Sequence, residues 1–343
     1  MSSKANTPAV VRLSDLKTGE RGTFFAVLAE RTRHSTQNDR PYYSCKFRDI
    51  HRTASYMVWH DSPHFRECDS SWEPGHFFKL QAIYSEHSKY GPQLESVEKI
   101  RFVNDRDKAD GFDPAELVAR SRSDPDEMLR ELLAFIRETI ADEPLRRLAC
   151  GLIERHGDRL KRLPAHEKRF YPFAGGLLEH TLSVARMATQ LADFFRDRYP
   201  DLKPPINKDL VAAGAVLHDI GHVAELEPSD SPFDRPKPTI EGRLVGHLVL
   251  GRDLVRDAAR EQVDLNPELL RLLEHLIVTH LDLPEWGPPR TSFIPEALIL
   301  FFADGLDARM EMFARCLMND SSAGPFTERD GLLGQRLLKG RDV

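Results

Sequence analysis

The chain contains 343 residues with 41% hydrophobic and 30% charged side chains, a balance that excludes wholesale disorder and a fibrous structure. Its length suggests two domains, each with enough chain to bury a core. The formal net charge of -6 excludes a protein that binds nucleic acid through bulk charge alone, so polyanion binding would have to rest on local basic patches or on metal ions.

Other features of the sequence predict a cytoplasmic protein. The longest apolar stretch, residues 297–303, is far shorter than the roughly 20 residues of a membrane-spanning helix, so no membrane partner is expected. The N-terminal residues 1–11 lack the apolar block of a secretory signal. The 4 cysteines are scattered and form no CxxC pair, which disfavours a disulfide framework and a zinc ribbon.

Short strands are predicted for residues 8–104. The segment 40–48 alternates with a period of two through Tyr43, Cys45 and Phe47, as a half-buried strand does. The predicted strands, separated by turn-like stretches, cover residues 22–30, 40–48, 53–59, 76–84 and 93–103. Five short strands at this spacing predict a small closed barrel of the OB type, with an SH3-like barrel or a sandwich as alternatives.

Aromatic and basic side chains are interleaved in these strands, which suggests that the barrel binds single-stranded nucleic acid. Aromatic rings can stack on bases while basic groups contact phosphates. The candidates are Tyr42, Tyr56 and Trp59 for stacking and Lys46, Arg48 and Arg52 for the phosphates. Because alternation places about half of a strand's aromatic side chains inside a barrel, Phe24 and Phe47 are expected in the core.

The pattern becomes helical beyond a charged segment that begins at Asn104. We predict a helical linker region over residues 105–164, a second domain over 165–320 and a tail over 321–343. One helix is predicted to begin at Pro114, and others cover residues 125–142, 177–195, 208–218, 246–259, 267–279 and 295–318. The fold class is therefore α+β multidomain, with a small N-terminal β-barrel followed by an all-α bundle.

Histidines and aspartates interrupt the apolar faces of these helices. They are His180, His218, Asp219, His222, His247, His275, His280, Asp304 and Asp307. Burying such groups is costly unless something inside binds them, and imidazole with carboxylate suits divalent ions such as Mn, Fe, Zn or Mg. Two ions bridged by an aspartate in a helical bundle can activate water for attack on a phosphate ester. The pattern therefore suggests a metal-dependent hydrolase.

The order of these residues resembles that of the HD-domain metallophosphohydrolases, in which a lone His precedes a His-Asp pair, further His residues and a late Asp. The resemblance covers about residues 165–318. Several strings resemble the YhaM-type 3′–5′ exoribonucleases, which place an OB-fold nucleic-acid-binding domain before the HD domain. These strings are GAVLHDIG, TIEGRLVGH, HLIVTH, EWGPP and EALILFFADGLDAR.

The resemblance implies two divalent ions, with Mn expected and Mg, Fe, Zn, Co or Ni as alternatives. The first ion would be held by His180, His218, Asp219 and Asp304. Asp219 would bridge to a second ion, held by His247 and by His275 or His280. Because five helical residues turn through about 500°, these last two side chains lie about 140° apart, and both face one site only if the helix ends between them.

Two departures from the family pattern concern this site. The family commonly reads His-Asp-x-Gly-Lys, and His222 stands where the lysine would fall, so activity is expected to be lower or more pH-dependent. Many relatives also have two consecutive histidines where this chain has His280 followed by Leu281. The remaining roles are catalytic for His218, Asp219 and His222, supporting for Asp307, and phosphate contact for Arg290 and Arg309.

Together these patterns predict a metal-dependent 3′–5′ exoribonuclease that hydrolyses single-stranded RNA to mononucleotides, with single-stranded DNA as a further substrate. Two alternatives stay open. One is an HD phosphohydrolase of a nucleotide or cyclic dinucleotide with a regulatory barrel, and the other is a nucleic-acid-binding adaptor with an inactive HD domain. A homo-oligomer is compatible with the apolar helices.

Overall fold

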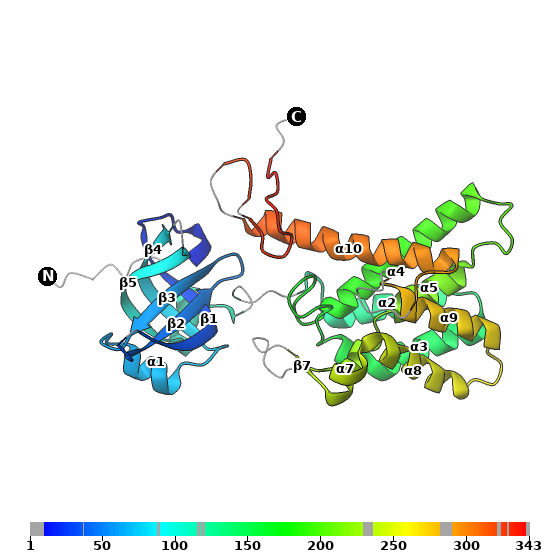
Figure 1. Cartoon of the computed structure of the whole chain (residues 1–343), viewed down its shortest axis with the longest axis horizontal. Helices are drawn as coiled ribbons and strands as arrows, with labels where there is room; N and C mark the ends of the chain where they lie inside the picture. Colours follow the sequence, from blue (N-terminus) through cyan, green and yellow to red (C-terminus); the bar gives the residue numbers. More distant parts are fainter. Residues whose placement is uncertain are drawn as a thin grey trace. The chain divides into compact units, whose positions relative to one another are not determined.

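The computed structural model describes residues 10–36, 38–87, 90–114, 117, 121–228, 236–281, 290–320, 324–327 and 329–340. These residues divide into two compact units, one within 1–119 and 315–343 and the other within 120–230 and 235–314. The first unit is built on a β-barrel and the second is an α-helical bundle (Figure 1), which confirms the predicted fold class. None of the described helices is both long and apolar enough to cross a membrane.

Five strands close into a barrel in the order β1-β2-β3-β5-β4, with β4 paired back to β1. Their bounds are β1 Arg21–Ser35, β2 Pro41–Arg48, β3 Thr53–Trp59, β4 Phe77–His87 and β5 Gly91–Phe102. Neighbouring strands are antiparallel except for β3 and β5. Helix α1 (Phe65–Ser71) lies in the connection from β3 to β4 (Figure 1), so strand order and connection are those of an OB-fold.

The barrel core explains why β2 alternates in sequence and β1 does not. Along β2 every second side chain is buried, and Phe47 is one of them. In β1 residues 23–28 are buried on both faces, since Phe112 covers the outer face at Phe25 with ring centroids 5.2 Å apart. Phe24 and Phe47 have no exposed surface, as predicted.

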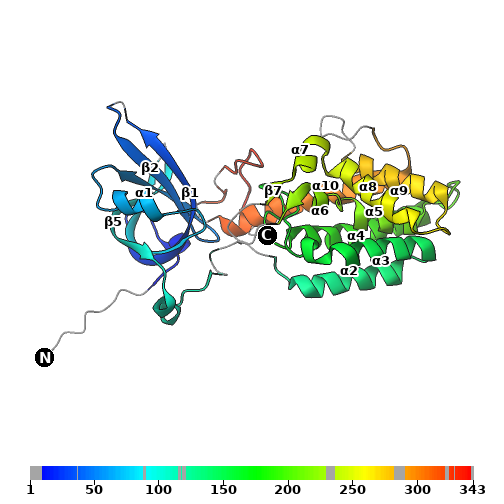
Figure 2. The same ribbon diagram turned by 90° about the horizontal axis from the view of Figure 1, so that it is seen from below.

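The helical unit surrounds a single apolar core. Its helices are α2 Pro125–Thr139, α3 Glu143–Leu160, α4 Gly176–Arg198, α5 Lys208–Leu217, α6 His222–Glu225, α7 Ile240–Val245, α8 His247–Arg260, α9 Pro267–Thr279 and α10 Pro295–Asn319, of which the last five residues belong to the first unit. Two short strands, β6 Leu226–Glu227 and β7 Lys237–Pro238, form a small ribbon. The core contains side chains from every long helix, and Figure 2 shows α2 and α3 side by side at one face of the bundle.

Three parts of the helical prediction differ from the structure or fall outside it. The predicted helix over 125–142 ends at Thr139, and α3, which was predicted only as part of a helical linker region, begins after Asp142 because the side chain of Asp142 accepts a hydrogen bond from the backbone N–H of Leu145 at 2.9 Å. Helices α6 and α7 are too short for hydrophobic periodicity to reveal them. The helix predicted from Pro114 falls mostly on residues outside the described part.

One buried carboxylate joins the end of β5 to η2 (Asp105–Asp110), the 3₁₀ helix after the barrel. Asp107 has a side chain only 1% exposed, and it accepts two hydrogen bonds of 2.7 Å from the guanidinium of Arg101. Lys79 Nζ and the backbone N–H of Asn104 also contact this carboxylate, at 3.3 and 2.9 Å. The hydrogen bonds from Arg101 hold the pKa of Asp107 well below its usual range.

Because its folded pKa is depressed, Asp107 contributes stability that is present above its unfolded pKa and is lost as the pH falls. We expect Asp107→Asn to lower the free energy of unfolding by about 2 kcal/mol at pH 7, less than a fully buried ion pair would lose because Arg101 is half exposed. In urea denaturation followed by tryptophan fluorescence, the difference from the wild type should shrink below about pH 4.

The matched control for this experiment is Asp110→Asn. Asp110 lies 2.5 Å from Nζ of the same Lys79, but its side chain is 49% exposed. An exposed pair contributes about 0.5 kcal/mol or less, so this variant should unfold close to the wild type. Equal losses in the two variants would show that burial of Asp107 does not matter.

Candidate metal centre

The structure brings together most of the histidines and aspartates that the sequence singled out. They come from α4, from the turn between α5 and α6, from the start of α8, the end of α9 and the middle of α10. Their ligand atoms form two groups, each within 4.8 Å, which are His180, His218 and Asp304 on one side and Asp219, His222 and His247 on the other. Each group could hold one cation.

Asp219 has one carboxylate oxygen on each side. Its Oδ2 lies 3.5 Å from Nε2 of His218 and 3.9 Å from Nε2 of His180. Its Oδ1 faces three further ring nitrogens, Nε2 of His280 at 3.4 Å, of His247 at 3.6 Å and of His222 at 3.7 Å. These separations exceed hydrogen-bond lengths, but two atoms that each lie about 2.0–2.2 Å from a shared cation are up to about 4.4 Å apart. The arrangement suits a bridging carboxylate.

The tautomers of His218 and His280 indicate whether a cation fits among these side chains. Nδ1 of His218 lies 2.8 Å from the carbonyl oxygen of Ala215, and Nδ1 of His280 lies 2.8 Å from that of Ile277. A carbonyl only accepts, so each Nδ1 carries a hydrogen, and in the neutral ring that a metal ligand must be each Nε2 directs a lone pair towards Asp219. Acceptors facing acceptors in a buried site are unfavourable unless a cation lies among them, so the donor set fits divalent ions.

His180 is held between two aspartates. Its Nδ1 lies 2.7 Å from Asp307 Oδ2 and its Nε2 lies 3.1 Å from Asp304 Oδ1, while Ser183 donates its hydroxyl to the other oxygen of Asp307. Asp307 therefore contacts a candidate ligand, and its supporting role stays a prediction. Burial would lower the pKa of His180, but the bonds to Asp304 and Asp307 raise it to about 10. Metal binding here would release that proton, because a ligating imidazole must be neutral.

Of the two histidines on α9, the structure places His280 in the cluster and His275 outside it. His280 has helical backbone angles of -61° and -21°, so the chain turns continuously between the two and their side chains diverge. Nε2 of His275 accepts a hydrogen bond of 3.1 Å from the backbone N–H of Phe293 instead.

Glu225 belongs to the site although sequence reasoning did not single it out. Its Oε2 lies 2.5 Å from Nδ1 of His222, and its Oε1 accepts a hydrogen bond of 3.2 Å from the backbone N–H of His247. Burial would raise the pKa of Glu225, but the bonds to the two histidines lower it to about 2. The signal was the spacing of three residues from His222, which puts both side chains on one helical turn.

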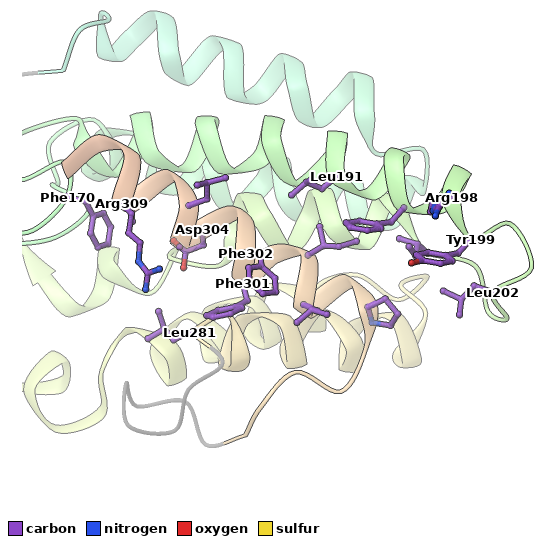
Figure 3. Close-up of a pocket in the computed structure, with 18 of the residues that line it drawn as sticks. Phe170, Leu191, Arg198, Tyr199, Leu202, Leu281, Phe301, Phe302, Asp304 and Arg309 are labelled. Atoms are coloured by element: carbon purple, nitrogen blue, oxygen red, sulfur yellow. The ribbon is translucent and has the colours of Figure 1, made fainter. Parts of the chain in front are cut away.

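A groove of about 1050 Å³ runs from Asp304 along α10, entirely within the helical unit. Figure 3 shows Phe170 and Arg309 near Asp304 and shows Arg198, Tyr199 and Leu202 at the far end. Its lining is mostly apolar and aromatic. Of the two arginines predicted to contact phosphates, Arg309 lines this groove, whereas Arg290 is exposed and does not.

In the barrel, three rings form an outward-facing row that we term the aromatic row. His34, Tyr42 and Trp59 occupy adjacent positions on β1, β2 and β3. Ring centroids of His34 and Tyr42 lie 5.2 Å apart, and those of Tyr42 and Trp59 lie 4.7 Å apart. Trp59 is 45% exposed, so the row can receive a further ring from solvent.

The other residues predicted to bind nucleic acid have different surroundings. Tyr56 faces inward and packs against the barrel core. Arg52 donates to the carbonyl oxygens of Leu13 and Leu16 at 2.8 and 2.6 Å, which ties down the chain before β1. Lys46, on the outward face, is paired with Glu30 at 2.8 Å. Arg48 alternates outward with Lys46 and is partly exposed.

Residues 177–309 match the family model of the HD domain, which indicates a superfamily of metal-dependent hydrolases. The match covers less than half of the chain and lies in the helical unit, so the protein combines an OB-fold barrel with an HD domain. HD domains bind divalent metals, and the two groups of His and Asp residues described above could hold them.

Solved structures similar to the chain include a crystal structure of a replication protein A domain from Methanococcus maripaludis, with 14% identity and a TM-score of 0.22 over 28% of this chain and 96% of that one. The solution structure of the second OB-fold domain of the same protein has 14% identity and a TM-score of 0.22, over 28% and 95%. Asparaginyl-tRNA synthetase from Entamoeba histolytica has 8% identity and a TM-score of 0.22, over 46% of this chain and only 37% of its own. The barrel assignment rests on strand order and register.

Gly221 allows the turn that carries Asp219 to approach α8. A Cβ at this position would overlap the carbonyl oxygen of His247 and would lie 2.7 Å from the backbone nitrogen of Gly251. Neither atom belongs to a flexible side chain that could move aside. Only glycine therefore keeps His247 this close to Asp219.

We expect Gly221→Ala to displace the start of α8, to cost about 1–3 kcal/mol of stability and to reduce the metal bound per chain. Thermal denaturation and elemental analysis after dialysis measure both effects. Gly151→Ala on α3 is the control, because nothing lies within 4 Å of the added Cβ, and it should stabilise slightly and keep its metal. Normal metal content in Gly221→Ala would refute the close-approach argument.

Proposed function

We propose that this protein is a metal-dependent 3′–5′ exoribonuclease of the YhaM type, which trims single-stranded RNA to mononucleotides and also accepts single-stranded DNA. The observation that carries the proposal is Asp219, whose two oxygens each face their own set of imidazole nitrogens next to an aromatic groove. A bridging carboxylate in a histidine cluster is one arrangement that can hold two ions close enough together for phosphodiester hydrolysis.

Two divalent ions at this centre would activate a water molecule and stabilise charge on the scissile phosphate. His180, His218 and Asp304 would hold one ion, and His247 and His280 the other, with Asp219 shared. The chain itself fixes these ligands, as Asp307 does for His180. Phe170 packs on the His180 ring with centroids 5.2 Å apart and excludes water from that side.

The groove along α10 supports a polynucleotide substrate. Its aromatic lining offers faces on which bases can stack, and such contacts tolerate any base. Arg309 is exposed at the end of the groove near Asp304, where it could meet a phosphate of the bound strand (Figure 3). The aromatic row of the barrel supplies a second stacking surface for the same strand.

The proposal predicts a defined pattern of cleavage. With Mn²⁺, a 3′-labelled single strand should lose its label at once as mononucleotide, whereas a 5′-labelled strand should shorten stepwise. Asp219→Ala should lower the hydrolysis rate by more than the roughly 100-fold that outer partners of a metal site cost, while RNA binding by the barrel persists. Hydrolysis of small nucleotides but not of oligonucleotides would contradict the proposal and favour a regulatory barrel.

The aromatic row gives a separate prediction. Trp59→Ala should weaken binding of a short single-stranded RNA by about 1–3 kcal/mol, and Trp59→Phe by less, because a ring remains to stack. Since stacking releases no counterions, the slope of affinity against salt concentration should not change. Fluorescence anisotropy at several salt concentrations measures both. Unchanged affinity in Trp59→Ala would remove the row from the binding surface.

A further inference from the structure

We propose that His222 is itself a ligand of a divalent ion and that Glu225 is the carboxylate that positions it. The second half of the centre would then offer imidazole nitrogens from His222, His247 and His280 together with one oxygen of Asp219. This inference rests on the metal-dependent part of the proposed function and is independent of RNA as the substrate.

The hydrogen bond to Glu225 sets the tautomer of His222. Nδ1 of His222 lies 2.5 Å from Oε2 of Glu225, and a carboxylate accepts, so Nδ1 carries the hydrogen. Nε2 is then left with its lone pair, and it lies 3.7 Å from Oδ1 of Asp219. This orientation is the one a metal-ligating histidine takes when a carboxylate holds its other nitrogen.

His222 and His247 act as a matched pair. Their rings stack with centroids 4.3 Å apart and planes inclined by 17°, and both Nε2 atoms approach the same oxygen of Asp219. Glu225 also fixes His247, through its backbone N–H. The Glu225 carboxylate thus orients the rings of both His222 and His247 towards Oδ1 of Asp219, so that three of the proposed ligand atoms of this ion lie together.

The surroundings favour a cation over a phosphate as the partner of His222. A phosphate would need an N–H from the ring, but Nδ1 is already bonded to Glu225 and Nε2 faces a carboxylate. Asp219 and Glu225 would both repel an anion, and their side chains are only 7% and 18% exposed, so water screens that repulsion poorly. A cation is attracted by both. At the position where the family pattern has a positively charged lysine, this chain therefore has a metal ligand, His222.

The additional imidazole should also affect which ion binds. Imidazole donors suit Mn, Fe, Co, Ni and Zn better than Mg, which prefers oxygen ligands and water. With three imidazoles and one carboxylate oxygen, this half of the centre should discriminate against Mg²⁺.

The test measures metal binding without RNA. Chelator-treated full-length protein is titrated with Co²⁺, and bound ions per chain and the visible Co²⁺ absorption are recorded. We expect His222→Ala and His222→Lys to lose or weaken one ion by about 10–100-fold with an altered spectrum, and to leave the other ion bound. Glu225→Gln should bind better than Glu225→Ala, because the amide oxygen still accepts from Nδ1. His156→Ala, on α3, should match the wild type.

Several results would overturn the inference. Wild-type ion number, affinity and spectrum in His222→Ala would show that His222 is no ligand, and so would a His222→Lys variant that keeps both ions. Metal-free melting curves identify a misfolded variant, in which case His222→Gln, closer in size, takes its place. If the wild type binds two ions but degrades no RNA, the exoribonuclease proposal fails while this inference stands.

Discussion

The site is organised by the charge of one buried carboxylate. Burial would raise the pKa of Asp219, but the protonated forms of the surrounding imidazoles lower it well below the usual range, so the carboxylate is anionic in a nearly water-free position. Burial lowers the pKa of His218 to about 4, so that ring is neutral and offers a lone pair. Burial would lower the pKa of His180, but the hydrogen bonds to Asp304 and Asp307 raise it, which favours a protonated ring there in the metal-free protein. Two divalent cations would balance the negative charge of the carboxylates in both groups of side chains. This charge balance explains why so many polar groups are tolerated in the core.

Most of the candidate metal ligands lie at the ends of helices and not in the middle of a helix face. The last carbonyls of a helix lack intrahelical partners, and His218 and His280 use such carbonyls three residues earlier to fix their Nδ1 atoms. The same backbone rule thus sets the tautomer of two ligands on two helices, α5 and α9. His222 and His247 stand at the other kind of end, as the first residues of α6 and α8, where a turn can bring them together. Gly221 makes that turn narrow enough.

Sequence reasoning reached the barrel and the long helices because their signals are local. Alternation in β2 and the caps and periodicity of α5 and α9 are properties of neighbouring residues. Helix α3 was not predicted as a separate helix, and the helix before it was predicted to run on to Asp142, because only the hydrogen bond from the N–H of Leu145 to the Asp142 side chain reveals where the new helix begins. In the site, residue types predicted that metal is bound but not which way each ring points. The spacing of Glu225 from His222 indicates that the two side chains can meet, but the contact of Glu225 with His247 and the choice of His280 over His275 depend on helix termini and tertiary contacts, which residue spacing does not encode.

The proposed function also explains why a stacking surface and a hydrolytic centre occur in one chain. A nucleic-acid strand bound to the aromatic row would be kept near the groove at an effective concentration set by the chain that links the two units. This effect does not depend on how the two units are placed. Weak stacking is then sufficient to keep the nucleic-acid strand bound. An exonuclease that cleaves the same strand repeatedly needs such weak contacts, because the strand must move forward after each cleavage. Base stacking on the row, and in the groove lined by Phe301 and Phe302, would tolerate any sequence. Selectivity would therefore come from the single-stranded, flexible form of the substrate, since only unpaired bases expose faces for both surfaces.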